Sequence, residues 1–142
     1  MRFIARSLGI AATTLALTAV SGTAGAAPTG PASLYAPSAL VLTVSEGTPE
    51  DGGAVLRAVT LTCAPTAAGT HPDPAGACAE LLATGARLDT VTEGGAAGPC
   101  TREWDPVTVT ADGVWQGLRF SYAHTFGNPC TRDNGSGTVF DF

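Results

Sequence analysis

The chain has 142 residues, with seven arginines, no lysine, twelve acidic residues and a formal net charge of −5. This length corresponds to one domain, and an apolar content of 44% excludes wholesale disorder. The negative charge excludes nonspecific binding to nucleic acid or to an anionic membrane by bulk electrostatics. Eighteen glycines and ten prolines argue against a helical bundle and favour short strands joined by turns.

Residues 1–26 have the pattern of a secretory signal peptide. Arg2 and Arg6 give a positive start, the run 8–20 is apolar, and small residues offer a cleavage signal after Ala26 or Ala27. The apolar run is too short to span a bilayer comfortably, which disfavours a membrane anchor. We therefore expect a secreted, soluble domain over residues 27–142, with a net charge of −7 once the two leader arginines are removed.

The first predicted elements after an irregular arm at 28–37 are two strands and a helix. The run 38–44 is rich in β-formers, and in the run 54–63 the odd-numbered apolar residues share one face. Asp73 can cap a helix that begins at Pro74 and ends at Gly85. Cys78 lies on the apolar face of this helix, where Cys63 at the end of a strand could meet it.

The second half of the chain predicts further strands. The run 107–110 alternates strictly, Asp112-Gly113 indicates a tight hairpin turn, and 114–122 returns as a strand. A last strand is predicted at 138–142. The sum is an α+β fold with about five short strands in an antiparallel sheet covered by a helix.

Catalytic, metal and cofactor chemistry find little support in the residues. His71 and His124 are the only histidines, and no Gly-x-Ser-x-Gly elbow accompanies them. The four cysteines have no C-x-x-C spacing for zinc, and in an exported chain an even count indicates two disulfides. Asn134-Gly135-Ser136 matches the glycosylation pattern, which is a weak signal by itself. We expect no enzyme, no metal and no cofactor.

The segment 94–106 is the most informative part of the sequence. Pro99 and Pro106 limit its backbone, Cys100 ties it to another part of the chain, and Arg102 stands between these points. An extended loop that exposes arginine suits a trypsin-like protease. If the loop is rigid, the amine released by cleavage of Arg102–Glu103 stays beside the acyl-enzyme, and effective molarities of ~10⁵–10⁸ M favour resealing over hydrolysis.

The sequence leaves undecided how this segment is stabilised and whether it has a function. The hydroxyl of Thr101 could donate to the carboxylate of Glu103 across the bond, which would reinforce the loop. On composition and spacing alone, a plain surface loop with an incidental arginine beside a structural disulfide is an equally good interpretation.

Four sequence blocks carry a family resemblance. They are Leu-Tyr-Ala-Pro-Ser-Ala-Leu-Val-Leu-Thr-Val at 34–44, Arg-Ala-Val-Thr-Leu-Thr-Cys-Ala-Pro at 57–65, Gly-Thr-His-Pro at 69–72 and Asp-Gly-Val-Trp-Gln-Gly at 112–117. With these blocks and four matching cysteines, the chain resembles the Streptomyces subtilisin inhibitor family of secreted serine-protease inhibitors from about residue 33 to residue 142.

The resemblance implies a five-stranded antiparallel sheet covered by two α-helices, with the second helix near 129–134, and a homodimer packed through the sheet. It implies disulfides Cys63–Cys78 and Cys100–Cys130. It places the reactive bond two residues after the third cysteine, at Arg102–Glu103. The protease-contact loop around that bond would comprise Pro99, Cys100, Thr101, Trp104 and Asp105.

These expectations combine into a secreted, non-enzymatic inhibitor that occupies the active site of trypsin-like and subtilisin-like serine endopeptidases as a substrate would. Family members often have proline at the position of Thr101, and Arg102 is what adds trypsin-like targets. Thr101, Trp104 and the Cys100 crosslink are expected to hold the loop. The alternatives are a non-inhibitory secreted binding module that uses its sheet, and a small extracellular hydrolase that uses His71 or His124.

Overall fold

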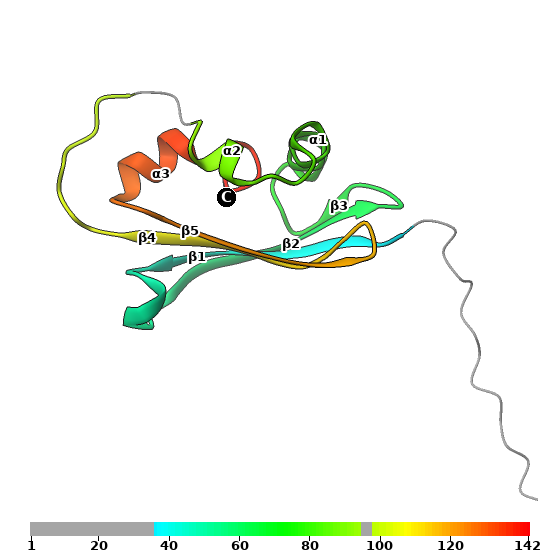
Figure 1. Ribbon diagram of the computed structural model, residues 1–142, viewed down its shortest axis with the longest axis horizontal. Coiled ribbons are helices and arrows are strands. Elements are labelled where there is room, and N and C mark those ends of the chain that lie inside the picture. The colour runs from blue at the N-terminus through cyan, green and yellow to red at the C-terminus, as the bar shows by residue number, and fades with distance from the viewer. Residues whose placement is uncertain (1–35, 95–97) are drawn as a thin grey trace, which may run out of the picture. The chain divides into compact units, whose positions relative to one another are not determined.

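The framework of the molecule is a five-stranded antiparallel sheet in the order β3-β2-β1-β4-β5 (Figure 1). The computed structural model describes residues 36–94 and 98–142, so the predicted signal peptide lies outside the described residues. The strands are β1 (Ser38–Glu46), β2 (Val55–Ala64), β3 (Ala68–Gly69), β4 (Val107–Trp115) and β5 (Leu118–Phe126). The expected antiparallel sheet is confirmed.

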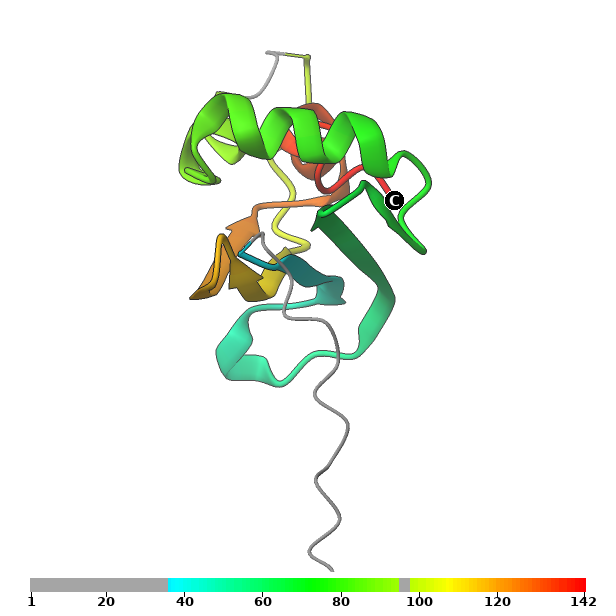
Figure 2. The same cartoon turned by 90° about the vertical axis from the view of Figure 1, so that its right-hand side faces the viewer.

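Three helices lie on one side of the sheet (Figures 1 and 2). They are α1 (Pro74–Thr84), α2 (Asp89–Thr92) and α3 (Pro129–Gly135). The α1 helix begins as predicted, because the side chain of Asp73 accepts a hydrogen bond from the Gly76 amide at 2.9 Å, and it ends at Gly85 with a φ of 61°. The α3 helix lies where the resemblance placed it. The single turn α2 was not predicted, since four residues are too few to show a helical period.

The core lies between the sheet and the helices. The largest fully buried side chains come from both layers and from the C-terminal turn: Leu42, Leu61, Leu81, Leu88, Val109, Val139 and Phe140. The disulfide Cys63–Cys78 joins β2 to α1 across this core and confirms the implied pairing. A loop of this length corresponds to about 3 kcal/mol of stabilisation in the chain-entropy model.

The predicted hairpin turn at Asp112-Gly113 is wrong. Strand β4 continues to Trp115, and the chain turns at Gln116 and Gly117, whose φ angles of 49° and 82° suit a two-residue hairpin turn. Gly113 instead pairs with Leu40 of β1, so close to that strand that a Cβ atom would collide with the Ala39 carbonyl oxygen. The glycine therefore marks a close approach of two strands.

The predicted last strand at 138–142 is also wrong. These residues form a turn in which the Phe140 amide donates to the Ser136 carbonyl oxygen at 3.1 Å. The Val139 amide donates to Glu80 on α1 at 2.9 Å, and Val139 and Phe140 are both fully buried. The segment pairs with no strand of the sheet among the described residues. The fifth strand is the two-residue β3. Among the described residues, no helix has the length and apolarity to cross a membrane.

Candidate functional site

The segment 98–106 forms an exposed arch that runs past α3 to the start of β4 (Figure 1). Residues 101–105 have no regular secondary structure and all five are exposed. The side chain of Arg102 makes no hydrogen bond or ion pair with the part of the chain that the structure describes. The arch therefore presents Arg102 to solvent, as the sequence predicts.

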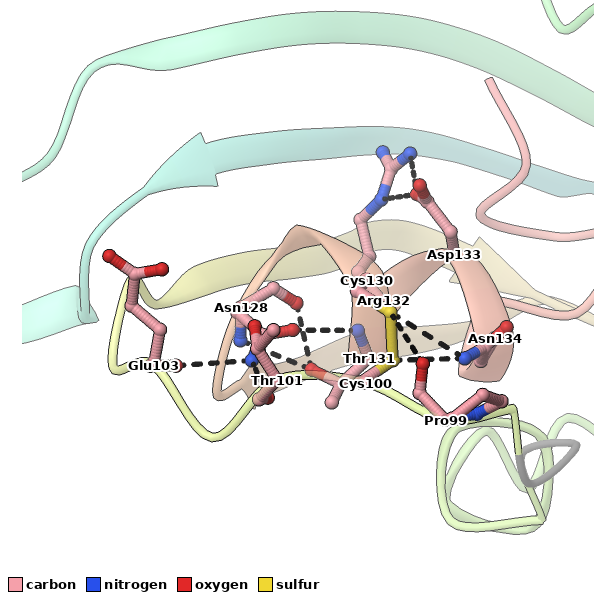
Figure 3. Close-up of a disulfide and its surroundings, with 10 residues drawn as sticks. All are labelled: Pro99, Cys100, Thr101, Glu103, Asn128, Cys130, Thr131, Arg132, Asp133 and Asn134. Atoms are coloured by element: carbon pink, nitrogen blue, oxygen red, sulfur yellow. Dashed lines mark hydrogen bonds and ion pairs between the residues drawn. A yellow bond between two sulfur atoms is a disulfide. The ribbon is translucent and has the colours of Figure 1, made fainter.

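The side chain of Asn128 holds this arch on both sides of Arg102. Its Nδ2 donates to the carbonyl oxygen of Thr101 at 2.9 Å and to that of Glu103 at 3.1 Å (Figure 3). Asn128 is only 5% exposed. The two carbonyl groups flank the Arg102–Glu103 bond. The side-chain amide of Asn128 therefore restrains the backbone on both sides of this bond.

The start of α3 orients that amide group. Asn128 is the N-cap, and its Oδ1 accepts from the Thr131 amide at 2.9 Å, while the Thr131 hydroxyl oxygen accepts from the Asn128 amide at 3.1 Å. This is a capping box with threonine in the reciprocal position. Because the oxygen of the side chain is used by the helix, its NH₂ group faces the loop, where only a donor can bind carbonyl oxygens.

The disulfide Cys100–Cys130 joins the arch covalently to α3 and confirms the second implied pairing. Asn134, one helical turn after Cys130, places its Nδ2 3.0 Å from the Cys100 sulfur (Figure 3). The N-cap Asn128, the disulfide partner Cys130 and Asn134 all belong to the seven-residue helix α3 or its cap. The helix α3 is thus the platform on which residues 98–103 rest.

The other end of the arch is held by the main chain. The Asp105 amide donates to the Gly127 carbonyl oxygen at 3.0 Å, and the Gly47 amide donates to the Pro106 carbonyl oxygen at 2.8 Å. Gly47 belongs to the β1–β2 connection, which lies at the same end of the sheet as the arch (Figure 1). Trp104 is 71% exposed, and its ring meets the framework at Gly127. Most of the indole is therefore available to a partner.

The β1–β2 connection beside the arch is itself capped. The hydroxyl and amide of Thr48 donate to the Asp51 carboxylate at 2.7 and 3.1 Å. These hydrogen bonds lower the pKa of Asp51 from its ordinary value, and the bond from the Thr48 hydroxyl has the larger effect. The same two hydrogen bonds close the capping box of the single 3₁₀ turn η1 (Pro49–Asp51).

The proposed bond between the Thr101 hydroxyl and the Glu103 carboxylate is absent from the described residues. The side chain of Glu103 points away from Thr101, and both residues are instead held by their carbonyl groups (Figure 3). Sequence reasoning missed Asn128. The Asn-Pro pair with Thr131 three residues after the asparagine could have marked a helix start, but not the contact with a loop 25 residues earlier.

The two histidines lie in structural roles. His71 is 4% exposed, its Nδ1 accepts from the Asp73 amide at 3.0 Å and its Nε2 lies 3.1 Å from the Val139 carbonyl oxygen. His124 packs edge-on against Phe126 at a ring separation of 4.5 Å. Within ranges 36–94 and 98–142, no three His, Cys, Asp or Glu side chains gather as a metal site would require.

An exposed loop that is fixed at both ends to a disulfide-linked framework is a geometry typical of small proteins that inhibit proteases. A family model described as "Subtilisin inhibitor-like" matches residues 36–128. The chain belongs to this family.

Individual relatives agree with the family match. "Protease inhibitor SIL-V2" of Streptomyces orinoci is 54% identical over 110 residues, which cover 78% of this chain and 100% of that protein. "Trypsin inhibitor STI2" of Streptomyces longisporus is 52% identical over 138 residues, covering 92% and 95%. Streptomyces caespitosus sermetstatin, solved in complex with Bacillus licheniformis subtilisin, is similar with a TM-score of 0.69 and 46% identity, covering 75% of this chain and 99% of that one. The chain is therefore a protease inhibitor and not an enzyme.

Proposed function

We propose that this protein inhibits serine proteases by the standard, substrate-like mechanism, with Arg102–Glu103 as the reactive bond. The observation that carries the proposal is the double hydrogen bond from Asn128 to the carbonyl oxygens of Thr101 and Glu103. These two residues lie on opposite sides of the bond. A protease that cuts the bond would leave both new ends attached to the same side chain.

The chemistry follows from this attachment. The protease serine attacks the Arg102 carbonyl carbon, the Arg102–Glu103 peptide bond breaks, and the amine of Glu103 takes up a proton as it leaves. The amine stays close to the acyl-enzyme because Asn128 and the Asp105–Gly127 hydrogen bond retain its side of the loop. Effective molarities of ~10⁵–10⁸ M then favour re-formation of the peptide over attack by water. The loop occupies the active site without being consumed.

The targets are trypsin-like and subtilisin-like enzymes. The exposed Arg102 matches a primary pocket that contains an aspartate, as in trypsin. Subtilisin-like enzymes would bind the extended backbone of the arch as an added strand. A relative named as a trypsin inhibitor and a similar protein solved with subtilisin support both target classes.

A tight-binding titration of trypsin and subtilisin tests the proposal. We expect stoichiometric loss of both activities with the wild-type protein, and loss of the trypsin effect alone in Arg102→Ala. Arg119→Ala is the matched control, because Arg119 is also exposed but lies on β5 near the hairpin turn that begins at Gln116. No inhibition by the wild type, with simple cutting after Arg102, would overturn the proposal and favour the non-inhibitory binding module.

We also propose that two copies associate through the face of the sheet opposite the helices. Val41 lies on the central strand β1 and is 47% exposed on that face. Its neighbour on that face is Thr43, whose hydroxyl is hydrogen-bonded to the hydroxyl of Thr110 on β4 at 2.7 Å. Sedimentation of the wild type should give a dimer, and Val41→Asp a monomer; a wild-type monomer would contradict this.

Secretion is likewise a proposal that follows from the leader pattern of residues 1–26. Expression of the full chain in a secreting host should give a protein in the medium that begins at Ala27 or Pro28. N-terminal sequencing of the recovered protein measures this. Retention of the complete chain inside the cells would contradict it.

A further inference from the structure

The side chain of Asn134 lies between α3 and the residues that precede the reactive bond. Its Nδ2 is 3.0 Å from the Cys100 sulfur and 3.8 Å from the Cys130 sulfur (Figure 3). Sulfur is a weak acceptor, so this hydrogen bond alone fixes little. Its direction matters, because the donor comes from the helix and the acceptor belongs to the loop.

A second contact of Asn134 is with the backbone at Gly98. A Cβ atom built on Gly98 would lie 2.7 Å from the Asn134 Nδ2, 3.0 Å from its Oδ1 and 3.1 Å from its Cγ. The asparagine amide thus occupies the space that a side chain at position 98 would need. Gly98 and Asn134 are complementary in shape, and the amide supports the loop at two points, Gly98 and Cys100.

The far side of Asn134 is open. A depression of about 350 Å³ lies among residues of α1, α2 and α3, and Asn134 forms part of its wall together with Glu80, Thr84 and Val91. A smaller side chain at position 134 would widen this depression. The loop backbone at 98–100 would then lose the group that separates it from this space.

We propose that Asn134 is a positioning residue of the reactive loop, which fixes the course of residues 98–101 toward the scissile bond. This inference rests on the proposed function. The disulfide Cys100–Cys130 limits the distance of the loop from α3, but a disulfide leaves several torsions free, and Thr101 does not restrict its own φ as a proline would. The amide of Asn134 removes part of that freedom. Asn134 is then present for its contacts with the loop, and its match to the Asn-Gly-Ser glycosylation pattern is coincidental.

The expected consequence is kinetic. In Asn134→Ala, residues 98–101 would move more freely after cleavage, so that water competes better with the leaving amine. The rate at which trypsin hydrolyses the loop should rise about threefold to tenfold, which corresponds to the loss of one weak hydrogen bond. Asn134→Asp keeps the shape of the side chain but cannot donate to sulfur at neutral pH, so it should show a smaller increase in the same direction.

A double-mutant cycle with Gly98→Ala separates positioning from a general loss of stability. Gly98→Ala alone should weaken inhibition, because its methyl group must displace the Asn134 amide. In Gly98→Ala/Asn134→Ala the methyl group has room, so the double variant should lose less than the sum of the single losses. A role of Asn134 in overall stability alone would give additive effects on inhibition.

The experiment measures trypsin inhibition, the hydrolysis rate of the loop and the thermal unfolding midpoint for wild type, Asn134→Ala, Asn134→Asp, Gly98→Ala and the double variant. Faster hydrolysis in both Asn134 variants, non-additive cycle effects and similar unfolding midpoints support the inference. A wild type that does not inhibit trypsin overturns the proposed function itself. A wild type that inhibits, combined with unchanged hydrolysis in the Asn134 variants or an additive cycle, overturns only the role of Asn134.

Discussion

Asn128 Nδ2 lies 2.9 Å from the carbonyl oxygen of Thr101, while the Oδ1 of the same side chain caps α3. One buried side chain thus couples the first turn of a helix to the loop that carries the proposed reactive bond. The coupling lets the two functions of Asn128 be separated by substitution, because the cap needs an acceptor and the loop needs a donor.

Asn128→Asp should keep the helix and lose the inhibition. Aspartate caps helices as well as asparagine does, so α3 should keep the contribution of its cap, and the fold loses only what the carboxylate facing two carbonyl oxygens costs. Its carboxylate cannot donate to the Thr101 and Glu103 carbonyl oxygens and repels them, so hydrolysis of the loop by trypsin should rise about tenfold or more. Chemical denaturation and the rate of appearance of the cut chain measure the two effects.

Asn128→Ala is the comparison for this variant. It removes both functions, so it should be cut as readily and also lose about 1 kcal/mol of stability. If Asn128→Asp inhibits as durably as the wild type, the side chain does not hold the loop in the way the structure indicates.

Thr101→Val should leave the hydrolysis rate of the loop unchanged. The Thr101 residue is held through its carbonyl group, and its hydroxyl makes no hydrogen bond to Glu103 within the described ranges. Valine has nearly the same shape and keeps the carbonyl group. A time course of cutting by trypsin, followed by mass spectrometry, measures the rate. Clearly faster hydrolysis would instead support a hydrogen bond from the Thr101 hydroxyl to the Glu103 carboxylate.

Trp104→Ala should weaken binding to both protease classes without loss of stability. The indole is 71% exposed in the free protein and lies two residues after Arg102, where a protease bound at the proposed reactive bond would cover it. Exposed tryptophans buried on binding commonly contribute about 2 kcal/mol or more, or roughly 30-fold in affinity. Dissociation constants for trypsin and subtilisin measure this, and Leu118→Ala, which removes an equally exposed apolar side chain from β5, is the control. Equal effects of both substitutions would contradict a specific contact.

Tyr122 should make stability sensitive to alkaline pH. Burial raises the pKa of Tyr122 above its ordinary value, outweighing the hydrogen bond of 2.6 Å with Thr92. Since the folded pKa is the higher one, the contribution of this group is complete below the unfolded pKa of about 10 and is lost as the pH rises through the folded pKa. The free energy of unfolding, measured by denaturation from pH 8 to pH 12, should therefore fall less steeply with pH in Tyr122→Phe than in the wild type. Parallel pH profiles would contradict the shift.

Removal of the Cys63–Cys78 disulfide should lower stability and spare the loop. This bond ties β2 to α1 and spans 15 residues, so Cys63→Ala/Cys78→Ala should lose about 3 kcal/mol. The arch is held by α3 with its cap and by Gly127, so inhibition measured well below the unfolding midpoint should persist. Loss of inhibition in a folded variant would show that the loop depends on the α1 side of the core.

Local signals predicted those parts of the structure whose causes are local. The start and end of α1 follow from Asp73 and Gly85, which act within one helical turn. The hairpin turn predicted at Gly113 was wrong because the glycine is needed for close contact with β1. That strand lies about 70 residues away in sequence, so no local turn pattern can reveal the contact. The exposed Arg102 was predictable from its neighbours, whereas the contact of Asn128 with the loop depends on how α3 packs against the arch. Sequence patterns thus predicted an exposed segment around Arg102 but not the side chain that restrains it.

The order of strands has a consequence for the fate of a cut chain. Cleavage at Arg102–Glu103 would assign β1 and β2 to one fragment and β4 and β5 to the other. In the sheet β1 lies between β2 and β4 and pairs with β4 from Ala39 to Glu46, so each fragment supplies half of a continuous ladder. The broken molecule would consist of two chains held together by the β1–β4 pairing and by the Cys100–Cys130 disulfide. Only global unfolding with reduction would release them, and the two ends of the break would remain neighbours throughout the lifetime of the fold.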